Sequence, residues 1–280
     1  MKNLISFQDT QDSTEIWLRV RTIYGILEDS DSKAMAKDFV ARAKDRNETS
    51  VAIITDIFRA STTLANLLDC GAKYIVLKGD PNVTKKIIEF KREKREGVYF
   101  GIGSDGNGEV IFELPNSPSI VRDKESSIKW RIGIMSTSKG TEAILNANES
   151  GFDKILIGSY PSTNAMVSYL NNAKKKKALA IMVVATEWKY SSNSTPTEDS
   201  IYADFVSHLL TGKDVEFDDF MEMTIQAQGA RRFRKNIPFF PLEDIELAVK
   251  EPSYFSFFPA VRQINDIIIV TKSRSMKYVI

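Results

Sequence analysis

Three hydroxyl-rich segments, each following an apolar run, contain the residues best suited to chemistry. The first carries Asp56 and Arg59, and the other two begin near Ser136 and Ser159. A carboxylate can hold a divalent metal or orient water, whereas arginine, hydroxyls and backbone NH groups can bind phosphoryl oxygens. The anion-binding candidates in these segments are Arg59, Ser61, Thr62, Thr63, Ser136, Thr137, Ser138, Lys139, Gly140, Thr141, Ser159, Ser162 and Thr163. Serine and threonine also commonly cap helices, so each one alone indicates only a cap.

Several other chemistries are disfavoured by the residues present. The single cysteine, Cys70, has no arginine shortly after it, as a cysteine phosphatase requires, and we expect it to be a small buried residue. The single histidine, His208, is expected near the surface of a helix, because histidine metal sites and triads need partners. Residues 138–141 place the lysine before the glycine, which excludes a P-loop. Asp56 lacks the second aspartate expected of an aspartyl-phosphate hydrolase, so catalysis must depend on carboxylates, hydroxyls, arginine and a metal.

The elements that position these residues can be predicted from four repeats of an apolar run, a polar turn and a helix-period segment. Strands are expected at residues 51–55, 131–135, 154–158 and 178–185, and the helices that follow at 61–69, 140–147, 162–171 and from about 197. Runs that are apolar on both faces fit inner strands of a mostly parallel or mixed sheet. We therefore expect a three-layer α/β/α fold. In such a sheet ligands bind beyond the carboxyl ends of the strands, so the turns should converge there.

Further elements are expected outside these repeats. Residues 74–77 add a strand, residues 16–20 partly alternate as an edge strand would, and residues 29–32 offer caps for a helix over 33–43. No Pro/Gly/Ser-rich linker divides the chain. We expect residues 1–45 to form a strand and helix extension packed on an α/β domain of residues 46–280.

The composition limits the partners of the chain. Its 280 residues carry a formal net charge of +1, so no global field attracts nucleic acid. No run approaches the roughly 20 apolar residues needed to span a bilayer, and the first residues lack the apolar core of a signal peptide. The charge runs at 91–96 and 174–177 lack interleaved aromatic residues and are expected to be solvated faces. We expect a cytoplasmic protein with neither nucleic acid nor membrane as a partner.

Several segments resemble one known family. Residues 55–63, Thr-Asp-Ile-Phe-Arg-Ala-Ser-Thr-Thr, resemble the Asp-Val-Leu-Arg-Ala-Thr-Thr signature of the 2-phosphosulfolactate phosphatases, which are magnesium-dependent enzymes of coenzyme M biosynthesis. Residues 112–118 are similar to the family's Phe-Asp-Leu-Gly-Asn-Ser-Pro, and residues 136–143 to its Thr-Thr-Thr-Asn-Gly-Thr-Arg-Ala. Gly158-Ser159-Tyr160 and Glu198-Asp199 follow in family order. The resemblance covers about residues 50 to 262 and leaves the first 45 without a match.

The resemblance implies Mg²⁺-dependent hydrolysis of a small phosphorylated acid, giving 3-sulfolactate and phosphate. The expected catalytic residues are Asp56, Arg59, Glu198 and Asp199, and the expected metal ligands come from Asp56, Glu113, Glu198 and Asp199. The expected substrate-binding residues are Ser61, Thr62, Asn116, Ser117, Thr137, Lys139, Gly140, Thr141, Gly158 and Ser159. A homodimer is a further expectation, since such enzymes commonly dimerise.

The chain departs from the family pattern at some of these positions. Lys139 and Glu142 stand where the family has asparagine and arginine, and Pro115 replaces a glycine. These departures leave two alternatives open: a relative that binds an anionic metabolite without turnover, and an interaction scaffold for the N-terminal segment. Simpler interpretations also remain for single residues, because Glu198-Asp199 suits a helix N-terminus and Asp56 with Arg59 could form a buried ion pair.

Overall fold

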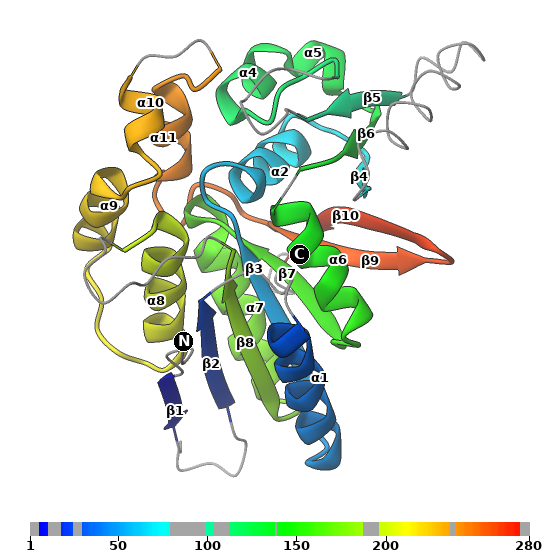
Figure 1. Cartoon of the computed structure of the whole chain (residues 1–280), viewed down its shortest axis with the longest axis vertical. Helices are drawn as coiled ribbons and strands as arrows, with labels where there is room; N and C mark the ends of the chain where they lie inside the picture. Colours follow the sequence, from blue (N-terminus) through cyan, green and yellow to red (C-terminus); the bar gives the residue numbers. More distant parts are fainter. Residues whose placement is uncertain are drawn as a thin grey trace.

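The computed structural model describes residues 6–10, 18–24, 30–78, 99–103, 112–137, 139–186, 196–235 and 239–274 (Figure 1). Its strands are β1 (Ser6–Thr10), β2 (Leu18–Tyr24), β3 (Thr49–Thr55), β4 (Tyr74–Leu77), β5 (Tyr99–Ile102), β6 (Ile132–Met135), β7 (Lys154–Gly158), β8 (Leu179–Ala185), β9 (Phe258–Ile264) and β10 (Ile267–Ser273). They form one mixed sheet in the order β1-β2-β8-β3-β7-β9-β10-β4-β6-β5.

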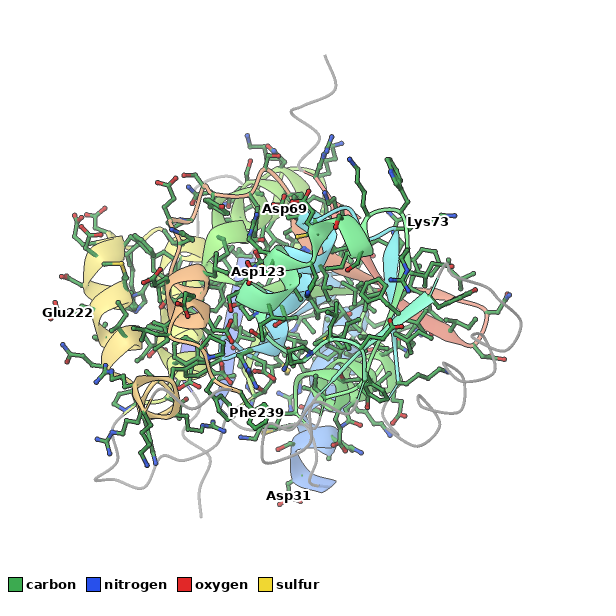
Figure 2. All side chains as sticks on the ribbon, turned by 90° about the horizontal axis from the view of Figure 1, so that it is seen from above. Asp31, Asp69, Lys73, Asp123, Glu222 and Phe239 are labelled. Atoms are coloured by element: carbon green, nitrogen blue, oxygen red, sulfur yellow. The ribbon has the colours of Figure 1, made fainter. Side chains whose placement is uncertain are left out.

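Helices cover the faces of this sheet. They are α1 (Ser30–Asp45), α2 (Ala60–Asp69), α4 (Pro118–Asp123), α5 (Glu125–Ile128), α6 (Gly140–Glu149), α7 (Thr163–Lys174), α8 (Glu198–Leu210), α9 (Phe217–Gln226), α10 (Arg231–Arg234) and α11 (Glu243–Ala248), with a 3₁₀ turn η1 (Tyr160–Ser162). Charged side chains such as Lys73 and Glu222 lie toward the outside of the molecule (Figure 2), and Asp123 is exposed as well. Within the described ranges, no helix combines the length and apolarity that a membrane crossing requires.

The sheet consists of two parallel groups joined by a hairpin. Strands β2, β8, β3 and β7 are parallel to one another, and so are β4, β6 and β5. The hairpin β9–β10 lies between the groups and pairs antiparallel with β7 on one side and β4 on the other. The strand direction therefore reverses at three successive pairings: β7 with β9, β9 with β10, and β10 with β4. As a result, β6 runs opposite to β3 in the sheet.

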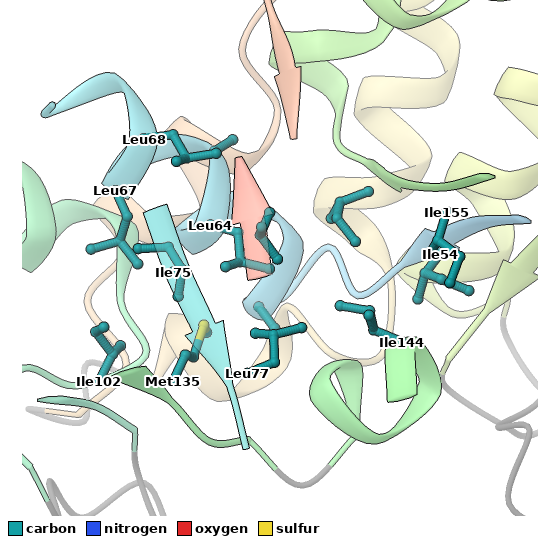
Figure 3. Packing of buried hydrophobic residues seen from close by; sticks show 14 of the residues in the cluster. Ile54, Leu64, Leu67, Leu68, Ile75, Leu77, Ile102, Met135, Ile144 and Ile155 are labelled. Carbon is teal, nitrogen blue, oxygen red and sulfur yellow. The ribbon is translucent and has the colours of Figure 1, made fainter. Parts of the chain in front are cut away.

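The central strand β3 shows how both faces are buried. Ala52 and Ile54 point into one apolar cluster, and Val51 and Ile53 point into the other, as the two-residue repeat of a strand requires. The first cluster includes residues of α2 and α6, and Figure 3 shows Ile54 within it. The second includes residues of α7 and α8. The expected three-layer α/β fold is thus confirmed, with a mixed sheet.

The predicted elements are present with small shifts in their ends. One prediction was wrong: the strand near residues 16–20 is not an edge strand, because β2 (Leu18–Tyr24) lies between β1 and β8. Its whole length pairs with β8, so the described N-terminal residues share the main sheet. The hairpin β9–β10 was not predicted, although its two-residue loop Asn265-Asp266, with Asn265 at φ 52°, has the residue types that such loops favour.

Candidate functional site

Three strands end side by side and bring their polar turns to one edge of the sheet. Thr55, the last residue of β3, is paired with Gly158 of β7 and Ala185 of β8. Because these strands are parallel, the segments that begin with Asp56 and Ser159 leave the sheet next to each other. The expected meeting of these turns is therefore present in the structure.

The turn after β6 reaches this edge by a different route, because β6 runs opposite to β3. Gly140, the first residue of α6, lies directly against the first turn. A Cβ atom added there would fall 2.7 Å from Asp56 Oδ2 and 2.8 Å from Ala60 Cβ. A glycine is needed at this contact because any larger side chain would displace the Asp56 carboxylate.

Hydroxyl groups hold the turn between β3 and α2. The Ser61 Oγ accepts a hydrogen bond from the Asp56 backbone NH at 2.8 Å, and the Ser61 NH donates to the Asp56 carbonyl at 2.8 Å. The Thr62 hydroxyl donates to the Ile57 carbonyl at 3.0 Å. Asp56 itself is half-buried, and its Oδ1 accepts from the Ala60 NH at 3.3 Å at the start of α2. Ser61 and Thr62 thus fix the position of Asp56.

The second turn is closed by a reciprocal pair of threonines. The Thr137 NH donates to the Thr141 Oγ1 at 3.2 Å, and the Thr141 NH donates to the Thr137 Oγ1 at 3.1 Å. This arrangement satisfies the Thr141 NH in the first turn of α6 and the Thr137 NH, which precedes the helix. Lys139 is half-buried at the N-cap of α6, Glu142 is exposed, and residue 138 lies outside the described residues.

Asp199 connects the first and fourth turns. It is buried at the start of α8, where its Oδ1 accepts from the Ile57 NH at 2.7 Å and its Oδ2 from the Thr186 hydroxyl at 2.9 Å. Its neighbour Glu198 is also buried and packs against Gly229, where any Cβ would clash with the Glu198 carboxylate. Asp199 therefore positions two turns through both of its oxygens.

Glu113 lies beside β6, which β7, β9, β10 and β4 separate from β3 in the sheet. Its carboxylate forms an ion pair with Arg131 at 3.6 Å, and Arg131 immediately precedes β6, whereas the Ser136 turn follows that strand. Within the ranges that the structure describes, no three acidic, histidine or cysteine side chains gather as a metal cage. The four expected metal ligands are thus not all brought together.

Arg59 is a buried cation held between aromatic rings. Its side chain is 6% exposed, and its guanidinium carbon lies 4.5 Å from the Phe240 ring centroid and 5.7 Å from that of Phe233. Nη1 donates to the Phe239 carbonyl at 2.7 Å and to Asp244 Oδ2 at 3.4 Å. Burial lowers the pKa of Arg59 below its ordinary value, and Asp244 opposes that shift. A guanidinium has five NH donors on three nitrogens. The hydrogen bonds to Phe239 and Asp244 both come from one of these nitrogens, Nη1.

Asp244 is the site residue that the sequence analysis missed. It is fully buried, and its Oδ1 accepts from the Ser117 hydroxyl at 2.7 Å, the Ser119 NH at 3.0 Å and the Ser119 hydroxyl at 2.6 Å. The expected substrate-binding residue Ser117 is therefore bonded to Asp244, and its neighbour Asn116 is half-buried. Asp244 links α11, the start of α4 and Arg59, which no local pattern could indicate.

Four buried hydroxyls near the strand ends have no hydrogen-bond partner within the described part of the chain. They belong to Thr63, Ser136, Ser159 and Ser162. Ser136 and Ser159 directly follow β6 and β7, Thr63 lies in the first turn of α2, and Ser162 directly precedes α7. A buried hydroxyl left unsatisfied costs about 1–3 kcal/mol, so groups of this kind favour a polar ligand.

A family model for 2-phosphosulpholactate phosphatase matches residues 38–246. The chain belongs to this family. Three relatives bear the name probable 2-phosphosulfolactate phosphatase. The protein from Thermoplasma volcanium is 30% identical over 175 residues, 62% of this chain and 74% of the relative. That from Thermoplasma acidophilum is 24% identical over 181 residues, covering 65% and 74% of the two chains. That from Clostridium beijerinckii is 23% identical over 239 residues, covering 83% and 88%.

The match to the 2-phosphosulpholactate phosphatase family confirms the resemblance inferred from the segments above. It includes Asp56, Arg59, Glu198, Asp199 and Asp244, whereas the hairpin β9–β10 lies beyond it. The residues that join the turns therefore all come from the part of the chain that the family shares.

Proposed function

We propose that this chain hydrolyses a small phosphorylated acid, 2-phosphosulfolactate or a close analogue, to 3-sulfolactate and phosphate. The observation that carries this proposal is the pair of buried hydroxyls of Ser159 and Ser162, without partners among the described residues, in the turn that leaves the sheet beside Asp56. Family membership and the names of the relatives support the same substrate class. Such a substrate would connect the chain with coenzyme M biosynthesis.

Catalysis would rest on charge neutralisation and an oriented water. A phosphate monoester repels an attacking water by its negative charge, so donors directed at the phosphoryl oxygens lower the barrier. The hydroxyls of Ser159 and Ser162 would donate to these oxygens, and the positive charge of Arg59 would stabilise them. Asp56 would accept a proton from the attacking water as the water oxygen bonds to phosphorus and the bond from phosphorus to the leaving oxygen breaks. This proton would then pass to the leaving oxygen, which becomes the hydroxyl group of 3-sulfolactate.

Magnesium is part of the proposal as a phosphate-bound ion. Mg²⁺ is usually held by one or two carboxylates together with substrate phosphate oxygens and water, so it needs no cage made of protein alone. Asp56, the half-buried carboxylate where β3 ends, would hold the ion, and Glu198 at the start of α8 is the second candidate. The ion would supply further charge neutralisation at the phosphoryl group.

The test is phosphate release from 2-phosphosulfolactate and a panel of phosphorylated hydroxy acids, with and without Mg²⁺. We expect turnover that needs the metal and that falls at least about a hundredfold in Asp56→Asn, the range expected for loss of a general base. The matched control is Asp123→Asn, which changes an exposed aspartate on α4 and should retain full activity. If Asp56→Asn and Arg59→Ala change neither turnover nor stabilisation by phosphate, the site is elsewhere.

A second candidate is a binding protein without turnover. The observation in its favour is that Lys139 and Glu142 stand where the family pattern has asparagine and arginine, which changes the charge beside the start of α6. Absence of turnover across the panel, together with a higher melting temperature in phosphate or a sulfonate, would establish this alternative.

A further inference from the structure

A cavity of about 440 Å³ lies at the opposite edge of the sheet from the candidate site. Thr49, Lys154 and Leu179, the first residues of β3, β7 and β8, contribute to its lining. The turns described above follow the other ends of the same three strands. Because β3 has seven residues, its two ends lie roughly 20 Å apart at a rise of about 3.3 Å per residue. The cavity is thus separate from the site at the strand ends.

The wall of the cavity is apolar and firmly packed. Leu179 is buried, and Ala173 and Tyr169 of α7 pack against the same apolar cluster. The Tyr169 ring is fixed against Phe258, with 5.1 Å between the ring centroids. A ligand in this cavity would therefore contact an aromatic ring and aliphatic groups in addition to polar side chains.

The rim of the cavity carries four lysines: Lys154, Lys175, Lys176 and Lys177. Lys154 lies with Nζ 5.7 Å from the Tyr169 ring centroid, and all four lysines are exposed. Across the described residues, the ion pairs found involve none of these four ammonium groups. No carboxylate of the described residues therefore balances their positive charge in an ion pair.

The acidic residue next to Lys154 does not balance this charge either. Asp153 directs Oδ2 at Ser50, accepting from its NH at 2.8 Å and its hydroxyl at 2.9 Å. The segment 174–177, expected from the sequence to be a solvated face, is exposed at its last three lysines, and these also lie around the cavity. Lysine stems are apolar and can cover a ligand while their charged ends stay in water.

We propose that this cavity binds a small organic anion with an aromatic or aliphatic body and a sulfonate, carboxylate or phosphate group. Its volume lies within the range of about 300–1,000 Å³ typical of small-molecule sites. An inorganic ion would leave the apolar wall of Tyr169 and Leu179 unused, and a neutral apolar compound would leave the lysines unused. Only a molecule with both parts matches both features.

The test uses the fluorescent probe 8-anilinonaphthalene-1-sulfonate, an aromatic sulfonate, titrated into the full chain. We expect saturable binding with one probe per chain that weakens as salt is raised, since the contacts are partly ionic. The double variant Lys175→Glu/Lys177→Glu should weaken binding roughly tenfold or more, equivalent to about 1.4 kcal/mol. Ala173→Leu, which adds bulk to the wall, should weaken binding without changing the charge.

The control variant is Lys124→Glu/Lys213→Glu, which gives the same change of net charge at exposed positions away from the cavity. It should bind the probe like the unmodified chain, and inorganic phosphate should not displace the probe. Circular dichroism and melting curves must show that each variant is folded, because the probe also binds loosened proteins. Equal loss of binding in both double variants, or no loss in the Lys175/Lys177 variant and Ala173→Leu, would overturn the proposal.

Discussion

Replacing Asp244 by asparagine tests whether the structure depends on a buried charge pair. The substitution keeps the shape of the side chain but removes the negative charge that faces Arg59, whose side chain is 6% exposed. The three donors of Ser117 and Ser119 all bond to the charged Oδ1, and asparagine would offer them a neutral oxygen or an NH₂ group instead. Removing one partner of a buried pair costs about 3–5 kcal/mol, because the other charge stays buried without compensation. We expect the free energy of unfolding to fall by that amount.

The chain contains a matched control on its surface. Asp69 and Arg122 form an ion pair at 2.8 Å, but their side chains are 34% and 28% exposed. Asp69→Asn should therefore lower the free energy of unfolding by only about 0–1 kcal/mol, since water replaces the lost partner. The two substitutions are chemically identical, so their difference measures the effect of burial.

A second substitution separates the charge from the hydrogen bonds. Arg59→Met removes the buried cation, and in the Asp244→Asn background it should restore part of the lost stability. The assay is urea unfolding followed by circular dichroism, with the slope of unfolding compared between variants. A loss below about 1 kcal/mol in Asp244→Asn, or no recovery in the double variant, would refute the reasoning.

Further predictions concern single residues. Gly140→Ala should reduce phosphate release at least about tenfold by displacing the Asp56 carboxylate, at a stability loss of about 1–3 kcal/mol measured by urea unfolding. Burial raises the pKa of the Cys70 thiol to about 11, so a disulfide reagent at pH 8 should label it only after unfolding. Burial, aided by Lys213, lowers the pKa of His208 below 6.5, so the unfolded chain binds this proton more tightly. Stability should therefore fall as the pH drops through 6.5 toward the folded-state pKa, and His208→Gln should flatten this part of a denaturation series.

The local elements could be predicted because their signals lie within a few residues. The apolar run at 51–55 followed by Asp56 is enough to predict a strand and a turn, and parallel pairing then brings the Asp56 and Ser159 turns together. The bond between Arg59 and Asp244 could not be predicted, because the two residues are 185 positions apart and their pairing depends on how α11 packs. The direction of β6 relative to β3 could not be predicted either, because it depends on the pairing of the distant hairpin β9–β10 with β7 and β4.

The placement of the hairpin β9–β10 has a consequence for synthesis on the ribosome. Its strands, Phe258–Ile264 and Ile267–Ser273, follow all other described strands in the sequence but lie between β7 and β4 in the sheet. A nascent chain can form each parallel group as it emerges, yet the two groups have no pairing partner at their facing edges until these residues leave the exit tunnel. Until then the edges of β7 and β4 are open to other chains, which makes this interval the one in which a chaperone would matter most.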